Sequence, residues 1–165
     1  MAVLPIRQYL EDPVLRRKAK AVTKIDKSVQ RLINDMVETM HQAQGVGLAA
    51  PQVSVSLRIV VIEVPDNKLI ALINPEIIKR TGVQAVNEGC LSVPGYWGEL
   101  TRSAEVIVGG KNRQGKAVRI KATGLMAEAF EHEVDHLNGV LYIDRVGGPE
   151  KLHTMSVENS MREAG

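Results

Sequence analysis

The chain has 165 residues, 44% of them hydrophobic and 24% charged, which is typical of one globular domain and excludes a disordered chain. The net charge of +2 is too small to indicate nucleic acid as a ligand. The N-terminal segment lacks the apolar stretch of a signal peptide and no apolar run is long enough to span a membrane, so we expect a cytoplasmic protein with no membrane partner.

The first third of the chain contains one clear helical pattern. Leu4–Ile6 is expected to be an extended arm that leads to a turn at Glu11–Pro13. From Asp26 to Gln44 apolar residues recur at steps of three and four, which predicts an amphipathic helix. Gly45–Gln52 is rich in glycine and alanine, so it forms either a tight turn or a backbone that another chain approaches closely.

The middle of the chain has the composition of strands. Strands are predicted at Leu57–Val64, Leu69–Ile73, Glu76–Arg80, near Val86, at Ala104–Val108, Ala117–Ala122 and Val140–Ile143. A helix with Thr123 as its N-cap and a stop at Asn138–Gly139 interrupts them, and it is apolar on two faces. The predicted fold class is therefore α+β, with mixed or antiparallel sheets surrounding a central buried helix, and with the amphipathic helix near the N-terminus.

The domain organisation expected from this pattern is simple. Residues 1–146 form one domain, and residues 147–165 are a tail that belongs to the same domain or is frayed. Leu152, Met155 and Met161 in this tail have a weakly helical spacing.

The pentapeptide His132–His136 (HEVDH) carries the strongest chemical signal. Residues four apart lie on one face of a helix, so His132 and His136 point to one place. Two imidazoles at this spacing are typical of a site for a divalent metal, with Glu133 beside them in position to move a proton at a water molecule. The alternative is a pair of ordinary polar histidines, but buried imidazoles need partners, and a metal supplies them.

A catalytic metal site needs a third protein ligand and a position left open for water. Cys90 is the only cysteine in the chain, so it cannot form an internal disulfide. A lone cysteine is more often a small buried hydrophobic residue. Here, however, it follows Gly89 in an irregular segment, whose backbone can bring the thiol close to another element. The predicted metal ligands are therefore Cys90, His132 and His136.

Three stretches resemble, in the same order, the three signature motifs of the peptide deformylase family. They are Gly45–Gln52 (GVGLAAPQ), Glu88–Ser92 (EGCLS) and His132–Leu137 (HEVDHL). The resemblance extends from about Leu4 to about Arg145, nearly the whole chain. It implies a metal-dependent hydrolase that removes the N-formyl group from the N-terminal formyl-methionine of nascent polypeptides, with release of formate. Its partners would be these nascent peptides, near the ribosome, without direct contact to nucleic acid.

The same resemblance implies roles for individual residues. Glu133 acts as general base and then as general acid, while the Gln52 amide and the Leu91 backbone N–H stabilise the oxyanion. Glu88 and Arg102 form a charge pair that holds the cysteine loop, although a surface ion pair of little energetic value is the plainer interpretation. The substrate cleft and its apolar pocket for methionine are formed by Val46, Gly47, Gly89, Leu91, Trp97, Leu125 and Ala129. For Trp97, a place on the surface or in the core is equally compatible with the sequence.

Family members are generally iron(II) enzymes that also work with nickel or cobalt and more weakly with zinc. The resemblance thus implies iron(II) in the cell, although ligand softness alone also fits zinc. Two residues depart from the family pattern: Glu131 stands where glutamine is usual, and Glu128 where apolar or basic residues are frequent. We expect these carboxylates either to raise the pKa of Glu133 or to alter the substrate cleft.

Two other functional classes stay open at this point. A metallopeptidase with the same two histidines needs a third ligand downstream of His136, and His153 is the strong candidate there, at an unusual spacing. A catalytically idle homologue would keep the cleft and bind blocked N-termini without releasing formate.

Overall fold

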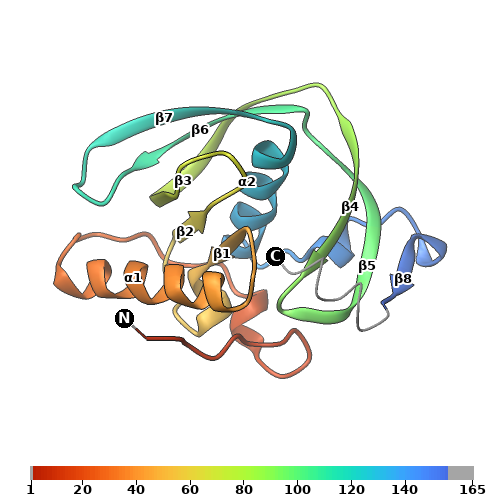
Figure 1. The fold of residues 1–165 in the computed structure, drawn as a ribbon, viewed down its shortest axis with the longest axis horizontal. Coiled ribbons are helices and arrows are strands. Elements are labelled where there is room, and N and C mark those ends of the chain that lie inside the picture. Colours follow the sequence, from red (N-terminus) through yellow and green to blue (C-terminus); the bar gives the residue numbers. More distant parts are fainter. Residues whose placement is uncertain (1, 156–165) are drawn as a thin grey trace.

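Residues 2–155, which the computed structural model describes, form two antiparallel sheets and two α-helices (Figure 1). The five-stranded sheet has the order β1-β2-β3-β6-β7, and the three-stranded sheet has the order β4-β5-β8. The strands are β1 (Gly47–Ala49), β2 (Ile59–Ile62), β3 (Ile70–Thr81), β4 (Gln84–Cys90), β5 (Val93–Arg102), β6 (Glu105–Lys111), β7 (Ala117–Thr123) and β8 (Leu152–Thr154). The predicted α+β class is confirmed.

The first helix, α1 (Lys27–Gln42), forms where the apolar spacing predicts it. Asp26 is the N-cap, and its carboxylate accepts a hydrogen bond from the Val29 N–H at 3.1 Å. The apolar face of α1 packs against the five-stranded sheet, in a cluster that includes Ile33, Met36 and Ile59. The opposite face is exposed, so α1 covers the sheet from outside, as Figure 1 shows.

The second helix, α2 (Gly124–Leu137), lies between the two sheets and contacts strands of both (Figure 1). Every residue from Ala129 to Leu137 is buried. Thr123 is the N-cap by position, but its side chain makes no capping hydrogen bond. At the other end, Arg58 donates to the carbonyl of Leu137 at 3.0 Å and to the Asn138 side chain at 2.9 Å. The Arg58 guanidinium thus provides a donor for a free carbonyl at the C-terminal end of the helix that carries the histidines, and its charge is favourable there.

Three strand predictions differ from the structure. Leu69–Ile73 and Glu76–Arg80 belong to one strand, β3, whose register shifts between Ile73 and Glu76. The predicted strand at Val140–Ile143 is wrong, because the chain there forms a 3-10 turn, η3 (Tyr142–Asp144), in which the Asp144 carboxylate accepts from the Leu141 N–H. The remaining 3-10 turns are η1 (Pro13–Arg16), η2 (Ala50–Val53) and η4 (Pro149–Lys151).

The described part of the tail packs onto the domain. β8 pairs with β5 in antiparallel register, with His153 opposite Trp97. The helical spacing expected around Leu152 is not realised there, because Leu152–Thr154 is a strand. Met161 lies outside the described residues. No helix within residues 2–155 is long and apolar enough to cross a bilayer.

The extended arm before Asp12 joins segments that are distant in sequence. The Arg7 N–H donates to the Gln52 carbonyl at 2.7 Å, and the Tyr9 N–H donates to the Ser92 carbonyl at 2.9 Å. The arm therefore ties the turn η2 to the turn between β4 and β5, and both of these turns contain predicted site residues.

Candidate metal centre

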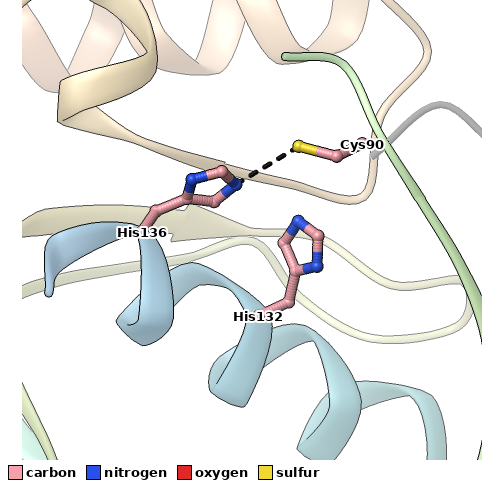
Figure 2. Close-up of side chains that lie close together, drawn as sticks. All are labelled: Cys90, His132 and His136. Atoms are coloured by element: carbon pink, nitrogen blue, oxygen red, sulfur yellow. Dashed lines mark hydrogen bonds between the residues drawn. The ribbon is translucent and has the colours of Figure 1, made fainter. Parts of the chain in front are cut away.

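The structure brings Cys90, His132 and His136 together in the interior. Each offers one ligand atom, and these three atoms lie within 4.8 Å of one another. The Cys90 sulfur is 3.2 Å from His136 Nε2, and Figure 2 shows both rings extending from successive turns of α2 toward the thiol at the end of β4. Among residues 2–155, they form the one cluster of three such side chains with this spacing. The two sheets thus place a thiol beside two imidazoles that α2 presents on one face.

A buried charge network orients His132. Its Nδ1 lies 2.7 Å from Glu88 Oε1, and Arg102 donates to both carboxylate oxygens of Glu88, at 2.6 and 2.8 Å. Arg102 also donates to Asp135 at 2.8 Å, and Arg145 donates to Asp135 at 2.6 and 2.9 Å. Because Nδ1 of His132 is committed to Glu88, Nε2 is left to face the cluster. Hydrogen bonds of this kind fix the ring and the tautomer of a metal-binding histidine.

Electrostatics keep this network in its charged form and one ring neutral. Burial alone would raise the pKa of Glu88, but hydrogen bonds from Arg102 and His132 lower it to about 2. The carboxylate is therefore ionised at neutral pH. Burial lowers the pKa of His136 well below its ordinary value, with the charges of His132 and Arg102 acting in the same direction. A neutral imidazole is the form that binds metals.

These residues fit a divalent metal. His132 Nε2 is buried without a hydrogen-bond partner in the described structure, although Nδ1 of the same ring is bonded. A buried nitrogen of this kind costs free energy unless something binds it. A thiol, a neutral imidazole and this nitrogen make a donor set that suits zinc or iron(II).

Glu133 lies next to the cluster and is almost completely buried. Its Oε1 has no hydrogen-bond partner among the described residues, and burial raises the pKa of Glu133 to about 7. A Cβ atom added at Gly47 would lie only 2.5 Å from Glu133 Oε2. Gly47 is therefore the residue that lets β1 pass close to this carboxylate.

The side chain of Gln52 is completely buried and is hydrogen-bonded at both ends of its amide. Oε1 accepts from the Ala49 N–H at 2.9 Å, and Nε2 donates to the Ser92 hydroxyl at 3.1 Å. Nε2 also lies 3.6 Å from the Cys90 sulfur. The N–H side of the amide therefore faces the thiol.

The other predicted cleft residues are distributed unevenly. Val46 packs against the cluster that contains Ala129, Leu91 packs against the core under α1, and Gly89 is buried in β4. Leu125 is 46% exposed at the start of α2. Val46 directly precedes β1, Gly89 and Leu91 flank Cys90 at the end of β4, and Leu125 lies in the first turn of α2.

Trp97 is not brought to this cluster. Its ring stacks on His153 at 4.2 Å between centroids, and His153 Nε2 is 2.7 Å from Glu99. Because successive side chains of a strand alternate between faces, Trp97 lies on the face of β5 opposite to Arg102. Trp97 is partly buried, so of the two other positions that the sequence left open for it, a place on the surface describes it better than a place in the core. His153 is likewise outside the metal cluster.

The two unusual carboxylates of α2 differ in their surroundings. Glu131 accepts from the Ser103 N–H at 2.6 Å and from Arg80 at 3.0 Å, so it pins the β5–β6 junction and β3. It is not among the groups that shift the pKa of Glu133. Burial and the neighbouring charge of Glu88 raise the pKa of Glu128 to about 7, which places Glu128 beside the charge network.

Sequence reasoning missed two polar residues of this region. Asp135 stands within the histidine motif but was given no role, although a carboxylate in a buried helix needs a partner, which here is Arg102. Ser92 lies two residues after Cys90. It was missed because the sequence does not show that its side chain is completely buried.

A buried thiol and two imidazoles around one point, with an unpaired carboxylate beside them, define a metal-dependent hydrolase. The family model described as polypeptide deformylase matches residues 3–152. A peptide deformylase of Dehalococcoides mccartyi is 56% identical over 155 residues, which cover 93% of each chain. The chain belongs to the polypeptide deformylase family.

Solved structures agree with this assignment. The crystal structure of the peptide deformylase from Thermotoga maritima has a TM-score of 0.86 at 44% identity and covers 90% of this chain and 100% of its own. A Met-Ala-Ser-bound peptide deformylase from Acinetobacter baumannii has a TM-score of 0.85 at 32% identity and covers 88% and 99%. The protein is thus a metal-dependent enzyme that removes the N-formyl group from nascent polypeptides.

Proposed function

We propose that Cys90, His132 and His136 together hold one divalent metal ion, and that this ion is iron(II) in the cell. The spacing of the three ligand atoms and the unpaired His132 Nε2 support the ligand set. When bound, the ion supplies positive charge that polarises the formyl carbonyl and makes a water molecule more acidic. Loss of activity in air, prevented by nickel substitution, is the result expected for iron, whereas insensitivity to oxygen indicates zinc.

Glu133 is the proton carrier in this proposal. Its carboxylate takes a proton from the attacking water and passes it to the departing amine nitrogen, first as general base and then as general acid. Two observations support the role: Glu133 Oε1 is buried without a protein partner, and Gly47 leaves room for the carboxylate beside β1.

The negative charge that develops on the formyl oxygen needs donors already in place. We assign this role to the Gln52 side-chain amide and to the backbone N–H of Leu91. The orientation of the Gln52 amide supports the assignment, because its N–H side faces the Cys90 sulfur rather than solvent. Leu91 follows the proposed cysteine ligand directly, so its N–H belongs to the same turn.

The substrate in this proposal is the formyl-methionine end of a peptide. The Acinetobacter relative binds Met-Ala-Ser, the product of deformylating the corresponding formyl peptide. Five apolar or small residues in or next to β1, β4 and α2 are assigned to the methionine pocket and the walls of the cleft beside it, and Gly89 is assigned to its base next to the thiol. They are Val46, Gly47, Leu91, Leu125 and Ala129. Trp97, whose ring stacks on His153, stays a predicted lining residue of the cleft.

The setting of the reaction follows from its substrate. We place the enzyme in the cytoplasm, on chains that emerge from the ribosome, without direct binding of nucleic acid or membrane. Residues 1–146 carry the catalytic machinery, and the tail, residues 147–165, is assigned to the same domain over its described part, residues 147–155. The pairing of β8 with β5 supports the second point for the described part of the tail.

The convergence of one thiol and two imidazoles carries the whole proposal. Formate release from formyl-Met-Ala-Ser, with and without a metal chelator, tests it directly. We expect release that the chelator abolishes and that added iron(II) or nickel restores. Cleavage of unformylated peptides would indicate a metallopeptidase, and peptide binding without formate would indicate an idle homologue. The metallopeptidase alternative lacks the third ligand expected for it, since His153 is bonded to Glu99.

A further inference from the structure

The Gln52 amide has a fixed orientation. Its Oε1 accepts from the Ala49 N–H, so the opposite, flipped arrangement would place two donors against each other. The NH2 group must then face the turn between β4 and β5. There it meets two acceptors, the Ser92 hydroxyl at 3.1 Å and the Cys90 sulfur at 3.6 Å. An amide nitrogen carries two hydrogens, one for each direction.

Ser92 is built into this turn more firmly than a surface serine. It is completely buried, and its carbonyl accepts from the Tyr9 N–H at 2.9 Å. On the other side of the same contact, the Gln52 carbonyl accepts from the Arg7 N–H at 2.7 Å. The N-terminal arm therefore holds both backbones, and the hydroxyl–amide hydrogen bond joins the two side chains between them.

We infer that Ser92 is a positioning residue for the reaction, acting through Gln52. By accepting one N–H of the amide, its hydroxyl fixes the amide plane so that the second N–H points to the thiol side, where the formyl oxygen gains charge. This inference rests on the role proposed above for Gln52. Without the hydroxyl, only the Ala49 N–H still holds the amide. A donor that must be in place before the transition state is then held less firmly.

Steady-state kinetics with formyl-Met-Ala-Ser test this inference on the metal-loaded enzyme. Ser92→Ala is expected to lower kcat about tenfold, the size of one hydrogen bond lost in a buried site, and to leave KM unchanged. Gln52→Ala removes the donor itself and is expected to lower kcat about 10²- to 10³-fold. The double variant should be no worse than Gln52→Ala alone, because Ser92 has no target left to orient.

Matched controls separate positioning from general damage. Ser103→Ala removes another buried hydroxyl, one that donates to Glu131 at 3.1 Å, and is expected to leave kcat unchanged. Ser92→Cys keeps the shape of the side chain, with a somewhat larger atom, but offers a weak acceptor, so its kcat should fall between those of wild type and Ser92→Ala. It also serves in the same comparison if Ser92→Ala does not fold. Metal content and Tm are measured for each variant.

The outcomes distinguish two failures. Full activity of Gln52→Ala would overturn the proposed role of Gln52 and this inference with it. A large loss in Gln52→Ala, multiplied further by Ser92→Ala in the double variant, would leave Gln52 in its role and overturn the inference about Ser92. Unchanged kcat in Ser92→Ala alone would do the same.

Discussion

The two α-helices have similar lengths, 16 residues in α1 and 14 in α2, but they bury their residues in different ways. In α1 the buried residues form one apolar stripe, and its single buried polar residue is Thr39. Its hydroxyl donates to the Asp35 carbonyl in the preceding turn and accepts from the Leu4 N–H of the N-terminal arm. In α2 five consecutive or nearly consecutive polar residues are buried between Glu131 and His136. α1 thus covers the core with one apolar face, whereas α2 lies in the interior and buries polar side chains together with apolar ones.

The difference shows how a functional helix is recognised. Burying a polar side chain without a partner costs several kcal/mol, so a helix that does it repeatedly must have a compensating arrangement. In α2 that arrangement is specific: Glu131 binds Ser103, Asp135 binds Arg102, and His132 binds Glu88. Three atoms of α2 differ from these: Glu133 Oε1, His132 Nε2 and His136 Nδ1 are buried without a hydrogen-bond partner in the described structure.

The largest effect is expected at the unpaired carboxylate of α2. Glu133→Ala should lower kcat by about 10²- to 10⁴-fold because the proton carrier is lost. Metal content should stay at one ion per chain, measured by elemental analysis, because Glu133 is not one of the three ligands. Glu133→Gln keeps the shape and should be as inactive. Near-normal turnover of either variant would contradict the role of Glu133 as proton carrier, and α2 would then not differ from α1 in this respect.

Met36 in α1 is expected to show the opposite behaviour. It is fully buried, so Met36→Ala should lower the free energy of unfolding by about 2–5 kcal/mol through lost contacts and a cavity. The kcat of the folded enzyme should not change, since α1 contributes no group to the site. Urea denaturation and kinetics below the transition measure the two quantities. Arg31→Ala, on the exposed face, is the control and should change stability by less than about 0.5 kcal/mol.

Arg102 tests the network behind α2. Arg102→Ala leaves Glu88 and Asp135 without their shared cation, so His132 loses its orientation. We expect metal affinity to fall about 10- to 100-fold, measured by competition with a chelator of known affinity. Lys121→Ala removes the cation of an exposed pair 3.7 Å from Glu105 and should leave metal affinity unchanged. Equal metal affinities in the two variants would mean that Arg102 forms an ion pair without influence on the metal site.

The smallest effect is expected at Glu131. Glu131→Gln keeps an oxygen for the Ser103 N–H but loses the charge that pairs with Arg80, whose side chain is 57% exposed. Such a pair contributes less than about 1 kcal/mol. Thermal unfolding should therefore shift only slightly, and kcat should stay the same. A marked fall in kcat would mean that the charge of Glu131 reaches the site after all.

Local patterns predicted the helices well and the second sheet poorly. The spacing of Ile33, Met36 and Met40 identifies α1 because a surface helix needs one apolar face. β5 was missed because Pro94, Gly95 and Gly98 disguise it, and its pairing with β4 and β8 depends on contacts distant in sequence.

The opposite error occurred at Val140–Ile143, an apolar run without a neighbouring strand. Gly139 has a φ of +75°, and a Cβ there would lie 2.6 Å from the Arg16 carbonyl, so the chain turns sharply as it leaves α2. The Asp144 carboxylate then closes a turn in place of a strand.

The candidate site shows the same division. Cys90 and the two histidines were predicted from residue type and spacing, and the structure brings them together. The partner of Asp135 and the bond between Gln52 and Ser92 join residues 33 and 40 positions apart, respectively. No local pattern contains such information. Trp97 was assigned to the pocket by resemblance alone, and its stacking on His153 depends on the late strand β8.

The position of α2 in the chain has a consequence for synthesis. Cys90 is separated from His136 by 46 residues, and every strand of the five-stranded sheet precedes the helix. A growing polypeptide that ends at residue 123 thus contains Gln52, Cys90 and Ser92, but it has only one of the three proposed metal ligands. The ligand set is completed only when the last quarter of the sequence leaves the ribosome, with α2 and its two histidines first and with β8, the third strand of the smaller sheet, after them.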